Sequence, residues 1–284
     1  MKRFDKKFGA SFIAEVPLGP GVYRMFNSQG ELIYVGKAKN LRRRLSQYRN
    51  AKRRKKHFKM RAIVAEATEI QIDLHESEWA ACVSETLIIQ NLKPKWNVAG
   101  AFYFLYPLMA VGYVDGEMEF LYTTEPESIN SEVASRLDFH GAFRSRFLCG
   151  RAFFSLMELL EFIGHKNKTR KFGKYTYLYS FRQIDESWKS DLNLFFRGES
   201  QDFFEKLILK LVESSSARRR PKEVQKCLND LKSFWRHEAC LLKRVRKFAS
   251  EPKYPIPQKE RDFLFIKYRY GATSIPIDGG WVAQ

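Results

Sequence analysis

The sequence predicts an α+β protein in which a small domain, an antiparallel central sheet flanked by helices, is followed by a mainly helical region. Three observations predict it. Two short runs rich in β-forming residues, GVYRMF and ELIYVG, flank a polar turn. Helical spacing of apolar residues follows from residue 40, and two long amphipathic patterns occupy residues 202–248. The chain has 284 residues and is 44% hydrophobic, which suffices for one large or two small domains.

The first two runs predict a β-hairpin closed by the turn NSQG at residues 27–30. A four-residue loop places Phe26 opposite Glu31. Counting outward, Tyr23 then faces Tyr34. Cross-strand partners have Cβ atoms about 5 Å apart, so we expect the two phenols side by side on one face of the sheet.

A helix is predicted to begin after Asn40, which is a suitable N-cap, and apolar residues recur at helical spacing as far as Tyr48. At about 100° per residue, Arg44 lies on the flank of this apolar stripe, whereas Arg42 and Arg43 point away from it. The three arginines are therefore not equivalent.

The remaining elements follow from the same patterns. We expect a helix at 58–65, a strand at 69–74, a helix at 76–92, a second hairpin within 101–124, a helix that ends at Gly164 before a polar basic stretch, an α-helical hairpin at 202–213 and 221–248, a linker at 251–258, and a last strand at 263–270. The predicted divisions are a frayed basic arm at 1–13, a compact unit at 14–100, a β-containing extension at 101–147, a helical region at 148–250 with its hairpin at about 198–247, and a tail at 251–284.

The charge balance indicates a polyanionic partner. The chain has 50 Lys and Arg against 32 Asp and Glu, a net charge of +18 and a pI near 9.7, so nucleic acid is the leading candidate. There is no apolar run of about 18 residues and no signal-peptide core, which favours a cytoplasmic protein without a membrane partner. Four widely separated cysteines without a CxxC pair predict reduced thiols: Cys82, Cys149, Cys227 and Cys240.

A basic run from Lys37 to Arg61 contains 13 Lys or Arg and no Asp or Glu. Such a run is either an inert solvated face or a surface that follows the phosphates of nucleic acid. Its aromatic residues and its position after the hairpin favour the second interpretation. The predicted DNA-contacting residues are Lys39, Arg42, Arg43, Tyr48, Arg53, Arg54, Lys55, Lys56, Lys93 and Lys95.

One carboxylate is out of pattern in the helix at 76–92. Glu85 has only apolar residues at its i−4, i−3, i+3 and i+4 positions: Ala81, Cys82, Ile88 and Ile89. Burying a bare carboxylate costs several kcal/mol, so a positive group must face it. An ordinary buried ion pair and a metal ligand or acid/base group both remain open from this helix alone.

Together these residues resemble the GIY-YIG nuclease family. The resemblance rests on GVY at 21–23, YVG at 34–36 followed by Lys37, Arg44 on the next helix, and Glu85 followed by NLKPKWN at 91–97. It is nearest to the N-terminal nuclease domain of UvrC. It continues more weakly to about residue 240, where the helical hairpin is similar to the one with which UvrC contacts UvrB.

The resemblance implies a site and a cofactor. Glu85 holds one divalent ion, Mg²⁺ or Mn²⁺, and Tyr34 orients or deprotonates the attacking water, with Lys37 supplying the positive charge that a tyrosine base requires. Tyr23 positions the nucleophile or phosphate, and Arg44 contacts the phosphoryl oxygens. Three residues are expected to be structural: Gly21, Gly36 and Asn97. His57 and His75 are expected to be surface or capping residues.

The resemblance also implies a structure- or damage-specific endonuclease that makes a single-strand incision on the 3′ side of a lesion in nucleotide excision repair. Its partners are then damaged double-stranded DNA and the UvrB–DNA complex. The chain ends before the RNase H-like half of UvrC, so a second, 5′ incision is not expected. The clustered cysteines of UvrC-like proteins are missing, so no iron–sulfur cluster is predicted. Two alternatives are a homing or restriction-type GIY-YIG nuclease and a catalytically silent DNA-binding repair scaffold.

Overall fold

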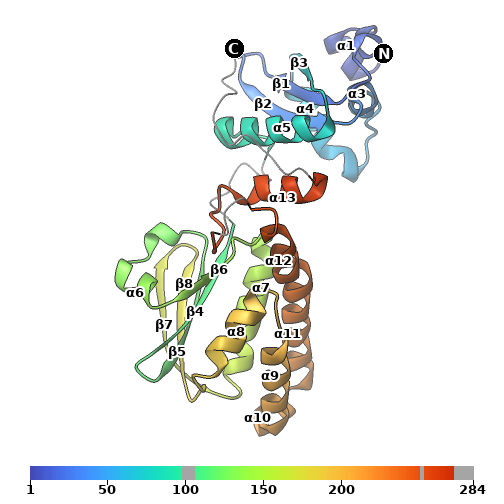
Figure 1. Ribbon diagram of the computed structural model, residues 1–284. Coiled ribbons are helices and arrows are strands. Elements are labelled where there is room, and N and C mark those ends of the chain that lie inside the picture. The colour runs from blue at the N-terminus through green and yellow to red at the C-terminus, as the bar shows by residue number, and fades with distance from the viewer. Residues whose placement is uncertain (98–105, 250–252, 272–284) are drawn as a thin grey trace. The chain divides into compact units, whose positions relative to one another are not determined.

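The computed structural model describes residues 1–97, 106–249 and 253–271. The chain divides into two compact units, Met1–Tyr103 and Phe104–Gln284 (Figure 1). Each unit combines helices with an antiparallel sheet, so the predicted α+β class is confirmed. Within the described ranges, every helix is too short or too polar to cross a bilayer.

The first unit is built on a three-stranded antiparallel sheet with the order β2-β1-β3. Its strands are β1 Gly21–Phe26, β2 Leu32–Ala38 and β3 Glu69–Leu74. Its helices are α1 Arg3–Phe8, α2 Phe12–Glu15, α3 Leu41–Arg49, the 3₁₀ turn Lys55–His57, α4 Phe58–Glu66 and α5 Glu78–Leu92. The predicted order of strands and helices over residues 21–92 is confirmed.

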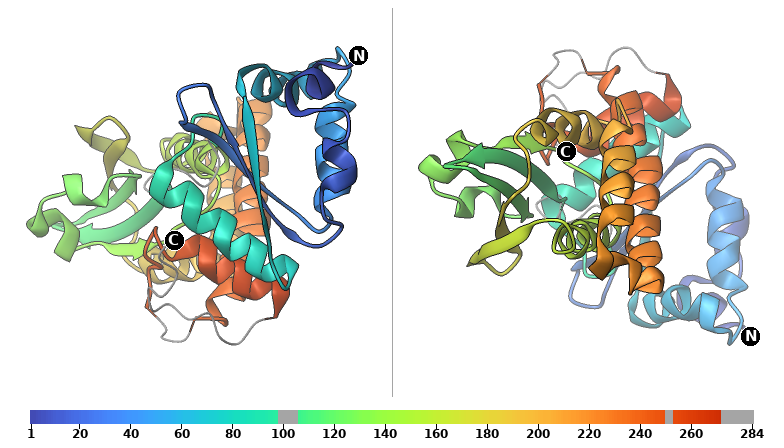
Figure 2. Two further views of the ribbon diagram at one scale, coloured as in Figure 1. Left: turned by 90° about the horizontal axis from the view of Figure 1, so that it is seen from above. Right: turned by 90° about the horizontal axis from the view of Figure 1, so that it is seen from below.

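The two faces of this sheet bury different helices. One face packs Tyr23 and Met25 against residues of α1, α3 and α4, and the other packs Val22 and Val35 against α5 (Figure 2). Because β2 is an edge strand, its outward-facing backbone groups have no strand partner. Side chains from elsewhere in the unit satisfy them, as the site shows below.

The predicted hairpin register is wrong by one residue at the turn and by two residues beyond the bulge, where Tyr23 pairs with Gly36 rather than Tyr34. Phe26 pairs with Leu32 rather than Glu31, and the register shifts between Met25 and Phe26. The cause is the turn, where the Asn27 side chain accepts from the backbone of Glu31 (2.9 Å) and the Asn27 N–H donates to the carbonyl of Glu31 (3.0 Å). This five-residue loop with a bulge follows from Asn chemistry that the strand pattern does not show.

The N-terminal residues were predicted to be a frayed arm, and this prediction is wrong. Phe4 of α1 is buried in the core of the first unit. Asp5 pairs with Arg49 of α3 (2.6 Å), and the Lys7 ammonium donates to the carbonyls of Ala65 and Ala67 (both 2.7 Å). The apolar residues between the lysines anchor this segment to α3 and α4.

The second unit contains a five-stranded antiparallel sheet with the order β6-β4-β5-β8-β7. Its strands are β4 Leu108–Val114, β5 Glu117–Thr123, β6 Asp138–His140, β7 His165–Gly173 and β8 Thr176–Arg182. Its helices are the 3₁₀ turn Pro126–Ser128, α6 Ser131–Ser135, α7 Arg146–Leu160, α8 Trp188–Phe196, α9 Asp202–Glu213, α10 Ser215–Arg218, α11 Pro221–Phe234, the π turn Trp235–Ala239, α12 Cys240–Arg246 and α13 Arg261–Tyr270.

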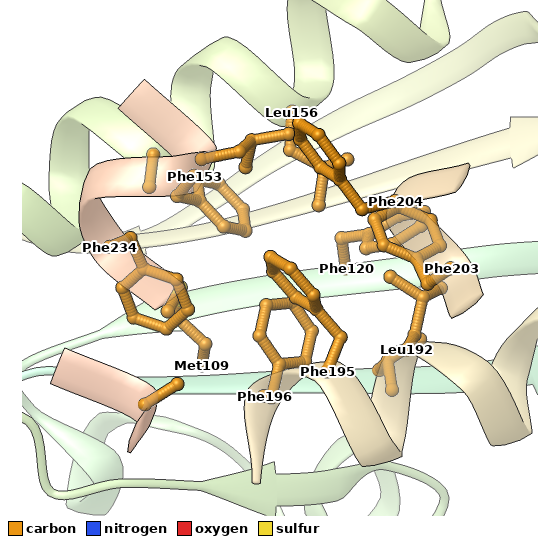
Figure 3. Packing of buried hydrophobic residues seen from close by; sticks show 14 of the residues in the cluster. Met109, Phe120, Phe153, Leu156, Leu192, Phe195, Phe196, Phe203, Phe204 and Phe234 are labelled. Atoms are coloured by element: carbon orange, nitrogen blue, oxygen red, sulfur yellow. The ribbon is translucent and has the colours of Figure 1, made fainter. Parts of the chain in front are cut away.

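Aromatic packing forms the core of this unit. Phe195 of α8 lies 5.4 Å from Phe203 and 6.2 Å from Phe234 between ring centroids (Figure 3). Phe120 and Met109 of the sheet belong to the same buried cluster. Helices α7 and α8 therefore cover one sheet face, while α6 packs on the other.

Several predictions for this unit are confirmed. The β4–β5 hairpin turns at Asp115 and Gly116, both with positive φ, as a two-residue turn requires; the expected start of its first strand at 101–105 lies outside the described residues. The α-helical hairpin forms between α9 and α11, with Pro221 in the first turn of α11.

Two local predictions for this unit are wrong. The basic stretch after Gly164 is strand β7, which interrupts the predicted helical region. Because β7 is an edge strand whose described side chains are largely exposed, its sequence has no alternation of apolar and polar residues. Residues 263–270, predicted as a strand, belong to α13. Leu264 and Ile266 are buried, and a short continuous apolar run of this kind fits a buried helix as well as a buried strand.

Candidate active site

The tyrosines of the hairpin are diagonal neighbours rather than cross-strand partners. Tyr23 pairs with Gly36, two residues from Tyr34, so both phenols lie on the same sheet face with ring centroids 6.0 Å apart. A Cβ at Gly36 would lie 2.4 Å from the Tyr23 hydroxyl. Only glycine therefore allows the Tyr23 phenol to lie against the backbone of β2.

Helix α3 contributes Arg44 and Tyr48 to this cluster. The Arg44 Nε donates to the Tyr23 hydroxyl (3.1 Å), and the Tyr23 and Tyr48 hydroxyls share a hydrogen bond (3.2 Å). The Arg44 guanidinium also lies over the Tyr48 ring, 5.4 Å from its centroid. Tyr48 is 3% exposed, so it joins the tyrosine cluster and is wrong as a predicted DNA contact.

Burial separates the roles open to the three phenols. It raises the pKa of both Tyr23 and Tyr48 well above the ordinary tyrosine range, so both remain protonated near neutral pH. Neither can act as a base there, and Tyr23 is fully buried. Tyr34 is only half-buried, which leaves it as the phenol of this cluster that a solvent molecule or substrate can reach.

Glu85 reaches the open edge of β2 from α5. Its Oε1 accepts the backbone N–H of Lys37 (3.1 Å), and its Oε2 lies 3.8 Å from the Lys37 ammonium. Burial raises the pKa of the Glu85 carboxyl, while the charges of Lys37 and Arg44 oppose that shift. With 20% of its side chain exposed, the carboxylate is desolvated yet accessible.

Lys37 was predicted to supply a positive charge near Tyr34, but it does not lie there. Residues 34 and 37 point to opposite faces of β2, and the Lys37 ammonium contacts Glu85 and the Cys82 thiol. The cation near Tyr34 is Lys59 of α4, 5.3 Å from its ring centroid. Sequence reasoning missed Lys59; its only signal was its place near the start of the helix that packs under β2.

Asn97 and Gly21 take structural positions. The Asn97 side chain accepts from the N–H of Val35 and donates to its carbonyl, both at 2.8 Å, as a strand partner would. A Cβ at Gly21 would lie 2.3 Å from the carbonyl oxygen of Asp73, because β1 and β3 approach closely there. Asn97 and Glu85 thus occupy successive outward-facing positions of β2.

The basic run is not uniform. The side chains of Arg43, Arg53, Arg54, Lys55 and Lys56 are exposed, as are those of Lys39, Lys93 and Lys95. Some have protein partners: Lys39 pairs with Glu78 (2.7 Å) and Lys95 with Glu66 (2.9 Å). Arg42 donates to the Val16 carbonyl (2.7 Å), which makes it a structural residue. His57 accepts the Lys52 N–H (3.0 Å).

A family comparison decides what this arrangement is. Residues 19–98 match the model of the UvrC-like GIY-YIG domain. They form a GIY-YIG domain of the UvrC-like type. This range contains every residue of the tyrosine cluster together with Lys37, Glu85 and Asn97. The domain is of an endonuclease type.

Several bacterial proteins share this GIY-YIG domain. The UvrABC system protein C of Hahella chejuensis is 42% identical over 96 residues, 34% of this chain and 15% of that protein. The protein of the same name from Cytophaga hutchinsonii is 33% identical over 157 residues, 55% of this chain and 24% of that protein. Because 157 residues exceed the length of the first unit, this similarity extends into the second.

A solved structure is also similar to part of this chain. The N-terminal GIY-YIG endonuclease domain of UvrC from Thermotoga maritima, bound to magnesium as its catalytic divalent cation, is 35% identical. It covers 34% of this chain and 99% of that chain, with a TM-score of 0.29. The chain spans 15–24% of the lengths of the two UvrABC system proteins above.

Proposed function

We propose that the chain is a Mg²⁺- or Mn²⁺-dependent DNA endonuclease that makes one incision on the 3′ side of a lesion in nucleotide excision repair. The observation that carries the proposal is Glu85, a desolvated but accessible carboxylate 3.8 Å from the Lys37 ammonium in a UvrC-like GIY-YIG domain. The role corresponds to that of the stand-alone UvrC homologue Cho.

The donor set fits a hard divalent cation. Such ions prefer oxygen ligands, and Glu85, with 20% of its side chain exposed, would supply a carboxylate, with waters expected as the other ligands. A bound ion would polarise the scissile phosphate and stabilise the leaving 3′ oxygen. Lys37 orients Glu85 through its backbone N–H and balances its charge when no ion is bound.

The other residues act on the water and the phosphate. Tyr34 hydrogen-bonds and orients the attacking water, and in its phenolate form it would take the proton of that water and become a neutral phenol. The Lys59 ammonium over its ring would stabilise the phenolate before the proton arrives. Arg44 neutralises the phosphoryl oxygens. Tyr23 touches no substrate; it holds the Arg44 guanidinium in place.

The exposed lysines and arginines of residues 39–56 give this unit a surface for the phosphates of double-stranded DNA. UvrB is the proposed protein partner, because the relatives are UvrABC system proteins and because α9 and α11 form the helical hairpin expected from the resemblance. The second unit would make that contact.

The test is incision of an end-labelled duplex with one bulky adduct, in Mg²⁺ or Mn²⁺, with and without UvrB. Glu85→Gln is expected to lower the incision rate about 10³-fold, because it removes the ligand charge while preserving shape. Mn²⁺ binding measured by calorimetry should be lost in the same variant. Glu69→Gln, which removes an exposed carboxylate of the same unit, is the matched control and should cut normally.

Undiminished cutting by Glu85→Gln would remove the proposed metal site. Equal cutting of an undamaged plasmid at a fixed sequence would support the restriction-type alternative instead. Adduct binding without any incision, in either metal and with UvrB present, would support a silent repair scaffold.

A further inference from the structure

A surface of the second unit combines exposed rings with cations, far along the chain from the GIY-YIG domain. Phe147 of α7 is 69% exposed and Phe154, two turns later, is 37% exposed. Tyr175 and Tyr177, in the β7–β8 turn and at the start of β8, are half-buried. Phe154 meets Tyr177 edge-on with ring centroids 5.4 Å apart. These four rings are called the aromatic platform below.

Three of the four rings have a cation beside them. Arg146 lies 4.9 Å and Lys174 5.3 Å from the centroid of Tyr175. Lys171 lies 5.6 Å from the centroid of Tyr177, and Arg151 lies 5.3 Å from that of Phe147. Cations interleaved with aromatic rings are the combination that nucleic-acid strands recognise, because the cations meet phosphates and the rings meet bases.

The platform lines an open groove of about 430 Å³ between α7, β8 and α11, with Lys226 on its far wall. The carboxylates in the groove have partners: Asp230 pairs with Arg151 and accepts from Ser155 (3.1 Å), and Glu158 accepts from Cys227 (3.1 Å). The lining has three cations, Arg146, Arg151 and Lys226, against the two carboxylates, so its net charge is positive.

We propose that this groove binds an unpaired segment of DNA, with bases stacked on the aromatic platform and phosphates held by the surrounding cations. Bases inside a duplex already stack on each other, so only unpaired bases can use exposed rings in this way. A protein partner fits less well, because an apolar protein face would bury the cations beside these rings without phosphates to neutralise them. The inference does not depend on cleavage by the GIY-YIG domain.

The test compares two oligonucleotides of equal length, oligo-dT and its abasic analogue, by fluorescence anisotropy with the full chain in EDTA. The pair shares its phosphates and differs in its bases. The unaltered chain should prefer oligo-dT at least about tenfold, and Phe147→Ala/Phe154→Ala should lose most of that preference. Leu209→Ala/Val212→Ala, which removes two exposed apolar side chains from α9, is the control and should keep it.

Charge is tested separately. Lys171→Gln/Lys174→Gln should reduce the slope of log K against log salt by about 1.4, the value for two lost single-strand phosphate contacts. Lys210→Gln/Arg220→Gln, in which both lost cations pair with neighbouring glutamates, should leave the slope unchanged. These variants alter exposed side chains only, so folding is preserved.

Equal affinity of the unaltered chain for oligo-dT and the abasic strand would overturn the proposal. So would an unchanged preference in the Phe147→Ala/Phe154→Ala variant when its circular dichroism spectrum is normal. Photo-crosslinking of a halogenated-uracil strand that labels the GIY-YIG domain alone would also count against it, whereas adducts on the platform would support it.

Discussion

Two buried helical glutamates, one in each unit, differ in what surrounds them. Burial raises the pKa of both Glu85 and Glu238. Glu238 uses both oxygens on backbone N–H groups at the start of α7, those of Arg144 (2.7 Å) and Ser145 (3.1 Å). Glu85 accepts one backbone N–H, and its second oxygen lies only within 3.8 Å of an ammonium at an open sheet edge. A raised carboxyl pKa alone therefore does not distinguish a candidate catalytic glutamate from a structural one. The hydrogen-bond partners of the two carboxylate oxygens make that distinction.

The same contrast holds for the two units as a whole. The second unit buries polar groups inside an aromatic core and satisfies them there, as His140 shows with Tyr254 (2.9 Å) and Asn193 (2.8 Å). The first unit places Tyr34, Arg44 and Glu85 around an edge strand, where they remain partly accessible, although Tyr23 and Tyr48 beside them are buried. His140 thus stabilises the interior of the second unit, whereas these three groups of the first unit can be reached from solvent.

The largest expected effect tests this contrast with one substitution in each unit. Glu238→Ala should lower the free energy of unfolding by about 3–5 kcal/mol, because two backbone N–H groups and the nearby buried Arg261 lose their acceptor and counter-charge. Glu85→Ala should change it by less than about 1 kcal/mol, since burial already disfavours its charge. Urea unfolding measures both; equal losses would erase the distinction.

The next effect is a pH dependence confined to the second unit. Burial lowers the pKa of His140 to about 4. Its unfolded pKa is about 6.5, so the stability it contributes is complete above that pH and is lost as the pH falls towards 4, by roughly 3 kcal/mol. Unfolding at pH 7 and pH 4.5 measures this loss.

His140→Gln is the variant that isolates the histidine, and His57→Gln in the first unit is its control. His140→Gln should flatten the pH dependence between 6.5 and 4, whereas His57→Gln should not. Parallel pH curves for the parent chain and His140→Gln would show that another group is responsible.

The sequence predicted features that depend on neighbours along the chain. Asn40 caps α3 by accepting from the Arg43 N–H (2.8 Å), and Glu85 was recognisable as a carboxylate on an apolar helix face. Motif spacing over residues 21–97 predicted the GIY-YIG domain for the same reason, since its elements follow each other closely.

Features set by distant contacts escaped prediction. The hairpin register depends on the Asn27 side chain and on the bulge next to Phe26, and the resulting shift of two residues moved Tyr34 from opposite Tyr23 to its diagonal. Lys59 rather than Lys37 lies near the Tyr34 ring, because strand alternation turns residues 34 and 37 to opposite faces. His140 has no spaced partner in the sequence, and its hydrogen bonds span 53 and 114 residues.

The smallest expected effect on stability tests whether the tyrosine cluster serves the fold or the chemistry. Tyr23→Phe keeps the ring against Gly36 but removes the hydroxyl that holds Arg44 and Tyr48, at a cost of about 1 kcal/mol in unfolding free energy. If Tyr23 acts by positioning Arg44, the incision rate should fall about tenfold, while Mn²⁺ affinity stays unchanged because Tyr23 makes no contact with Glu85. If Tyr23 is purely structural, Tyr23→Phe should lower the stability of the chain without changing the incision rate of the folded fraction. A loss of Mn²⁺ binding would show that the tyrosine cluster and Glu85 are one coupled network rather than two separate groups at the edge of β2.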